Sequence, residues 1–158
     1  MNLKAEALSE IQVTRQFFNR ATRCLKEEHS AFRPQPEMMS VAAQVAHTAQ
    51  AIDWFREGAF DGNWNMDFET MAAETDKAPS LDSARQAMEA AWDRLRQAVE
   101  ASTEEQLAAT LPDNPILPGR PLYHVLEAVV DHTAHHRGSL AVYARMAGLV
   151  PEMPYGED

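Results

Sequence analysis

The sequence predicts an all-α protein, a four-helix bundle with long connections on both sides of the third helix. Apolar residues recur at helical spacing in four segments of about 20 to 28 residues each. Nothing between these segments has the alternating pattern of a strand. With 158 residues, of which 45% are hydrophobic, the chain is long enough to bury a core. We therefore expect residues 1–158 to form a single domain.

The first two helices are marked by their apolar spacing and their ends. The first is expected over residues 3 to 28, where apolar side chains recur at steps of three, four or seven: Leu8, Ile11, Phe18 and Leu25. The sequence RPQP at residues 33 to 36 ends it. Ser40 then suits the N-cap of an alanine-rich second helix that extends to about Gly58.

The second half of the chain continues the pattern after a polar connection. A serine N-cap and an apolar stripe predict the third helix over residues 80 to 102. A short helical turn is expected at 103 to 110, and the proline-rich segment 111 to 119 excludes regular structure. The fourth helix is expected over 121 to 147, because proline suits a first turn and Gly148 a stop. The pattern leaves the handedness of the bundle open.

Composition excludes several classes of partner. The formal net charge is −10, and no basic run is present that would follow a phosphate backbone, so nucleic acid is not expected as a partner. The single cysteine, Cys24, has no internal partner for a disulfide, and the N-terminus lacks the apolar core of a signal peptide. No apolar segment approaches the roughly 20 residues of a membrane span. We therefore expect a cytoplasmic protein that does not enter the membrane.

Three of the six histidines lie in the segment DHTAHHRGSL, residues 131 to 140. On a helix, His136 falls within the apolar stripe and His132 at its edge, whereas His135 lies roughly 100° away from His136 and points outward. The i, i+4 spacing of His132 and His136 lets two ring nitrogens meet one cation. The competing interpretation is two core histidines that are hydrogen-bonded to the backbone or to acids, and the spacing alone does not decide between the two.

A third ligand would have to come from another helix, and His47 is the candidate. The helical wheel places His47 away from Val41, Val45 and Ile52, on a second face with Ala43, Ala51 and Trp54. Periodicity alone therefore does not direct it toward His136. A lone histidine in such a position is usually structural. His29 is set aside as a C-terminal cap of the first helix.

The segment DGNWNMDFE, residues 61 to 69, begins like a calcium-binding EF-hand loop. Met66 stands where that loop needs glycine, and Ala72 stands where it needs a bidentate glutamate. We therefore interpret the segment as a polar surface loop without calcium.

Two longer stretches, SVAAQVAHTAQAIDWF and PLYHVLEAVVDHTAHHRGSLAVYARMAGLVPEMPYG, resemble the DinB-like metal-dependent four-helix bundles. The specific part is one histidine in the second helix, here His47, and an H-x-x-x-H-R-G signature that begins at His132. The resemblance implies that His47, His132 and His136 bind one divalent metal ion per chain, nickel or zinc, and that His135 is not a ligand. Asp131 and Ser139 depart from the commonest family pattern, which leaves open which groups orient the imidazoles.

Three protein ligands leave coordination positions for water or substrate, as in catalytic metal sites. The resemblance thus implies a metal-dependent enzyme, a thiol-linked transferase or isomerase or a hydrolase, with a low-molecular-weight thiol as one option for a cosubstrate. The alternative is a metal-binding or stress-associated bundle without turnover, for instance a homodimer whose site stores or senses metal. We assign no general acid or base, and we favour a structural pairing for Arg137 over contact with an anionic substrate.

Overall fold

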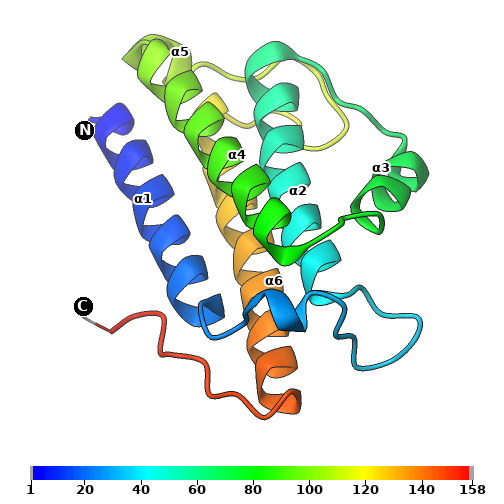
Figure 1. Ribbon diagram of the computed structural model, residues 1–158. Helices are drawn as coiled ribbons and strands as arrows, with labels where there is room; N and C mark the ends of the chain where they lie inside the picture. Colours follow the sequence, from blue (N-terminus) through cyan, green and yellow to red (C-terminus); the bar gives the residue numbers. More distant parts are fainter. Residues whose placement is uncertain (1, 157–158) are drawn as a thin grey trace.

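A computed structural model describes residues 2–156, and in this range the chain forms six α-helices and no β-strand (Figure 1). The all-α prediction is confirmed. Four long helices build the bundle: α1 (Leu3–Thr22), α2 (Val41–Asp61), α4 (Leu81–Ala101) and α6 (Val125–Met146). Helix α1 packs against α4 and α6, and α2 packs against the same two helices, so that α1 and α2 occupy opposite corners.

The shorter elements lie in the connections. Helix α3 (Phe68–Thr75) lies beside α2, and α5 (Glu104–Ala108) confirms the short helical turn expected there. Two 3₁₀ turns, η1 (Glu27–His29) and η2 (Leu122–His124), precede the second and last long helices. No helix within the described range combines the length and the apolar character of a membrane span.

Helix α1 ends at Thr22, six residues earlier than predicted. The guanidinium of Arg85, on α4, donates to the carbonyl oxygens of Thr22 and Leu25 at 2.8 and 3.3 Å and so satisfies the end of the helix. The prediction that His29 caps this helix is therefore wrong. Its Nδ1 instead accepts from the backbone N–H of Lys26 at 2.9 Å, within the following 3₁₀ turn.

Helix α2 begins where it was predicted, with the Ser40 hydroxyl accepting from the Ala43 N–H at 3.1 Å. It continues past Gly58 to Asp61 and ends at Gly62, whose φ of 72° is the left-handed conformation that glycine adopts most easily. Gly58 thus lies inside the helix.

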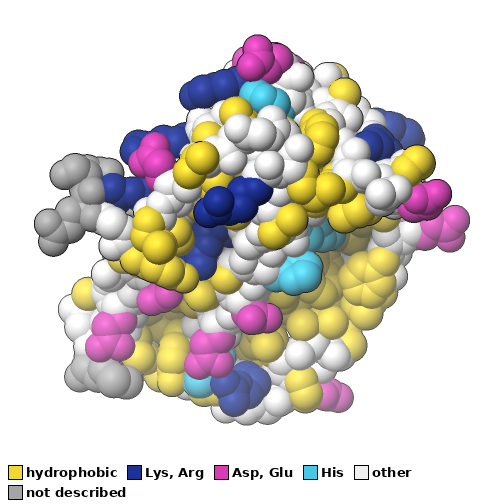
Figure 2. Space-filling view, turned by 90° about the horizontal axis from the view of Figure 1, so that it is seen from below, with side chains coloured by type: hydrophobic (Ala, Val, Ile, Leu, Met, Phe, Trp, Pro, Cys, Tyr) yellow, Lys and Arg dark blue, Asp and Glu magenta, His cyan; other side chains and the backbone are white. Residues whose placement is uncertain are grey.

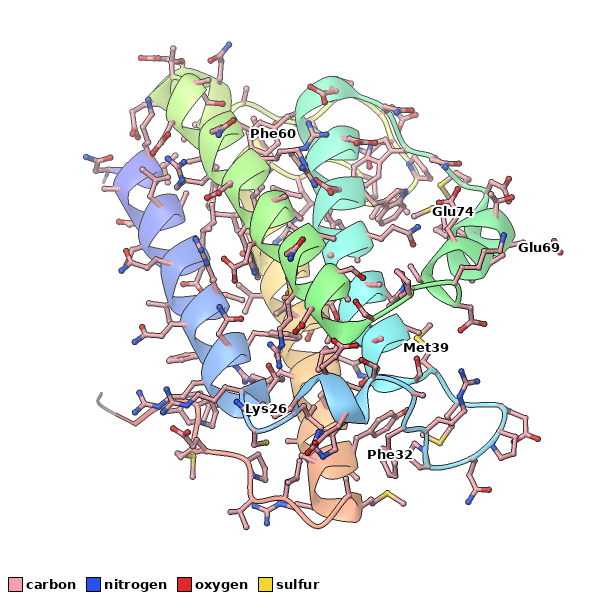
Figure 3. The ribbon with its side chains drawn as sticks, in the orientation of Figure 1. Lys26, Phe32, Met39, Phe60, Glu69 and Glu74 are labelled. Carbon is pink, nitrogen blue, oxygen red and sulfur yellow. The ribbon has the colours of Figure 1, made fainter. Side chains whose placement is uncertain are left out.

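Helix α3 is the element that the sequence interpretation missed, because the connection between the second and third expected helices, with segment 61 to 69 in it, was expected to be a polar loop. Asp67 caps it by accepting from the Thr70 N–H at 3.1 Å, which is an ordinary N-cap signal within the segment that begins like an EF-hand. Helix α3 lies on the outside of the bundle, with Glu69 projecting away from it (Figure 3). The connection that contains it runs from one end of the bundle back to the other, because α2 and α4 point the same way (Figure 1).

The core lies between the four long helices. Its largest fully buried side chains include one from each of them: Phe18, Ile52, Trp92 and Leu140. The segment between η1 and α2 closes one end, where Phe32 lies beside the last turns of α6 and contacts the ring of Tyr143 at 6.3 Å between centroids (Figure 3). Helices α2 and α6 run antiparallel (Figure 1).

Two helical glycines differ in what surrounds them, and this difference predicts opposite effects of one substitution. A Cβ atom at Gly58 would come within 2.2 Å of the Trp64 ring, whereas one at Gly138 would meet nothing within 4 Å. We expect Gly58→Ala to lower the free energy of unfolding by about 1 to 3 kcal/mol through overpacking. Gly138→Ala should raise it by roughly 0.5 to 1 kcal/mol, because alanine favours a helix interior. Urea unfolding of the two metal-free variants measures both changes, and equal effects would contradict this packing.

Candidate metal centre

The contact between α2 and α6 brings together three histidines that are far apart in the sequence. His47 lies in the second turn of α2, and His132 and His136 lie one turn apart on α6. The three ring centroids are separated by 4.5, 4.8 and 5.1 Å. The set that the resemblance implied is thus assembled by two antiparallel helices.

The distances between the nitrogens suit a shared cation. The Nε2 atoms of His132 and His136 lie 3.3 Å apart. Two imidazoles that bind one tetrahedral cation at about 2.0 to 2.1 Å have nitrogens roughly 3.3 to 3.4 Å apart. With His47 included, all three candidate donor atoms lie within 4.8 Å of one another. This upper limit exceeds the spacing of a shared tetrahedral cation by about 1.4 Å, so a small inward movement of the His47 ring would complete a site of this kind.

The interpretation as ordinary core histidines predicts hydrogen bonds to the backbone or to acids. None of the three Nδ1 atoms has a hydrogen-bond partner among the described residues, although all three are buried. The rings contact one another instead. The interpretation as core histidines bonded to the backbone or to acids therefore lacks the hydrogen bonds that it requires. The ligand role rests on the approach of the ring nitrogens to one another.

Burial lowers the pKa values of all three imidazoles. The pKa of His136 falls to about 3 and that of His132 to about 4, first through burial and then through the neighbouring histidines. The pKa of His47 is lowered by burial and by His135. All three rings are therefore neutral at pH 7, which is the form that binds a metal.

The neighbours of the histidines on α6 have other roles. His135 is exposed, as predicted, and touches the candidate set only through an edge-on contact with the His136 ring at 4.8 Å. The Arg137 guanidinium lies 5.6 Å from the Phe17 ring centre and 5.5 Å from that of Tyr155, and donates to the Tyr155 hydroxyl at 3.2 Å. It therefore joins the C-terminal segment to α1 and α6.

The sequence analysis did not identify Phe55 as a residue that contacts the candidate metal centre. The buried ring of Phe55 lies 6.2 Å from that of His132, and Phe55 lies two turns beyond His47 on α2. Eight residues place Phe55 roughly 80° around the helix from His47, so the spacing gave no signal of this contact. Figure 2 shows histidine side chains near the middle of one face of the molecule, with hydrophobic side chains beside them.

The lowered pKa values predict how the metal-free protein responds to acid. Between pH 6.5 and about 4 the unfolded chain binds protons at these histidines that the folded chain does not bind, so the free energy of unfolding falls as the pH falls. Urea unfolding with a chelator present, at pH 6.5, 5.5 and 5, measures how the free energy of unfolding changes with pH. These pH values lie above the range in which glutamates titrate. His132→Asn should weaken this dependence of the free energy of unfolding on pH. A wild-type free energy of unfolding that does not change with pH in this range would contradict the burial of these rings.

Comparison with known proteins agrees with this architecture. A crystal structure of a DinB-like protein from Bacillus subtilis, YjoA, is similar to the chain with a TM-score of 0.69 and 21% sequence identity, over 95% of this chain and 96% of that one. No curated protein sequence matches the chain. The DinB superfamily matches residues 10–140, a range that contains all three histidines. The chain therefore belongs to the DinB superfamily.

Proposed function

We propose that the chain binds one divalent metal ion, nickel or zinc, through His47, His132 and His136. The observation that carries the proposal is the convergence of three neutral imidazoles, one buried and two partly buried, whose donor atoms lie within 4.8 Å of one another. Imidazole is a ligand that suits both metals. Membership of the DinB superfamily is compatible with this role.

We further propose that the bound metal is catalytic. Three protein ligands leave at least one position for an exogenous group, whereas structural zinc sites are normally closed by four. A metal held in this way acidifies a bound water or thiol and polarises a carbonyl group. The contribution of the chain is to present three uncharged donors and, through Phe55, to shield His132 on one side from water.

For the exogenous group we propose a low-molecular-weight thiol, in a transferase or isomerase reaction, with hydrolysis by bound water as the other enzymatic option. A thiolate is a soft ligand that binds zinc and nickel well. The chain's own thiol, Cys24, is not part of the cluster of donor groups that the three histidines form within the described residues.

The ligand assignment predicts the outcome of four alanine variants. Replacement of His47, His132 or His136 removes one of three donors and should weaken zinc binding by about 10- to 100-fold or more, because loss even of an outer partner has an effect of that size. His135→Ala is the matched control, one residue from a ligand but exposed, and should keep full stoichiometry. Elemental analysis and competition with a chromogenic chelator measure this. Undiminished affinity of His136→Ala would overturn the assignment.

The catalytic interpretation predicts a spectroscopic response to thiols. A cobalt-loaded chain should develop sulfur-to-cobalt charge-transfer absorption when a thiol occupies the open position. Titration with a panel of low-molecular-weight thiols and the matching alcohols measures this, and His132→Ala serves as a control without the site. An unchanged spectrum with every thiol would count against the thiol-linked reaction and favour a metal-binding bundle without turnover.

A further inference from the structure

A continuous series of aromatic contacts leads from the candidate metal centre to the surface. The Phe55 ring contacts His132 at 6.2 Å and Trp54 at 5.0 Å. Trp54 in turn contacts Trp64 at 5.1 Å and Phe68 at 5.7 Å. We name these four residues, Phe55, Trp54, Trp64 and Phe68, the aromatic wall. It links α2, the following loop and α3.

The backbone of α2 is adapted to hold this wall in place. Gly58 lies under the Trp64 ring, which a Cβ atom would approach to 2.2 Å. The Trp54 indole N–H donates to the Asn65 carbonyl at 2.7 Å and so fixes the loop that carries Trp64. Trp64 is therefore held by close packing on Gly58, and Trp54 by a specific hydrogen bond.

The wall and the centre share one side of α2. His47, Ala51, Trp54 and Gly58 are spaced i, i+4, i+7 and i+11, which aligns them along the helix. Ala51, the residue between His47 and Trp54, has the shortest side chain that a non-glycine residue can have. On this side of α2, the side chain between His47 and the aromatic wall is therefore only a methyl group.

The outer end of the wall is exposed. Phe68, the first residue of α3, is 51% exposed, and Met66, in the loop just before it, is 47% exposed. The outer end of the wall therefore presents apolar surface to solvent. Apolar side chains that gather at the surface next to a functional site are typical of ligand-binding surfaces.

We propose that the aromatic wall binds an aromatic or extended apolar group of the molecule that occupies the open metal position. The inference rests on the proposed metal site and narrows its substrate class: one end of the ligand supplies the group bound to the metal, and the other end is an uncharged ring or chain packed against Trp54 and Phe68. Stacking on such rings is worth about 0.5 to 1.5 kcal/mol beyond burial for each pair, roughly a two- to thirteenfold change in affinity.

A series of hydroxamates tests this, because each chelates the metal in the same way and only the attached group differs. The cobalt-loaded chain is titrated with acetohydroxamate, benzohydroxamate and 4-phenylbenzohydroxamate. The affinity of the chain for each hydroxamate is divided by the affinity of a small cobalt complex for the same hydroxamate, which corrects for differences in chelating strength. We expect a gain of about two- to thirteenfold for each added ring. Equal corrected affinities across the series would contradict the proposed role of the aromatic wall. Binding of acetohydroxamate would in that case still support the proposed metal site.

Two variants locate the effect. Phe68→Ala removes a half-exposed ring and should abolish the gain from the second phenyl group without changing the affinity for acetohydroxamate. Trp54→Leu should reduce the gain from the first. Val142→Ala, an equally exposed apolar residue on α6, is the matched control and should change neither. A loss in Phe68→Ala no larger than in Val142→Ala would contradict the proposal. A chain that binds no cobalt would instead overturn the proposed function itself.

Discussion

The packing of α2 against α6 is the contact on which the candidate centre depends. It holds the His47 ring 5.1 and 4.8 Å from the rings of His132 and His136, which are contributed by the neighbouring antiparallel helix α6. Helix α4 supports α2 from its other side, and α1 supports α6. Burial between these helices lowers the pKa values of the histidines and keeps them neutral. Helix packing therefore sets both the distances and the protonation state at the centre.

Much of the architecture follows from local sequence, and the errors have local causes. The N-caps Ser40 and Ser80 act as predicted, because a serine hydroxyl at these positions satisfies the first free N–H groups of each helix. The end of α1 was wrong because the group that satisfies it, Arg85, comes from α4 and is invisible to a local pattern. Helix α3 was missed because polar composition outweighed the capping signal of Asp67.

The site was predictable to different degrees. The spacing of His132 and His136 predicts a pair of donors, and their 3.3 Å separation agrees with it. His47 could not be placed by periodicity, because the helical wheel identifies a single apolar stripe. Helix α2 packs on two of the long helices, and its second face, with Ala43 and Ala51 buried, carries His47. Only the resemblance to a family selected it.

The central claim is that three imidazoles from α2 and α6 share one metal ion and leave it open to an exogenous ligand. A crystal structure of the zinc- or nickel-loaded chain, with the metal located by its anomalous scattering, tests this most directly. We expect one metal peak about 2.0 to 2.1 Å from one ring nitrogen each of His47, His132 and His136, with a non-protein ligand in a remaining position. A peak elsewhere, or a fourth protein ligand that closes the site, would contradict the claim.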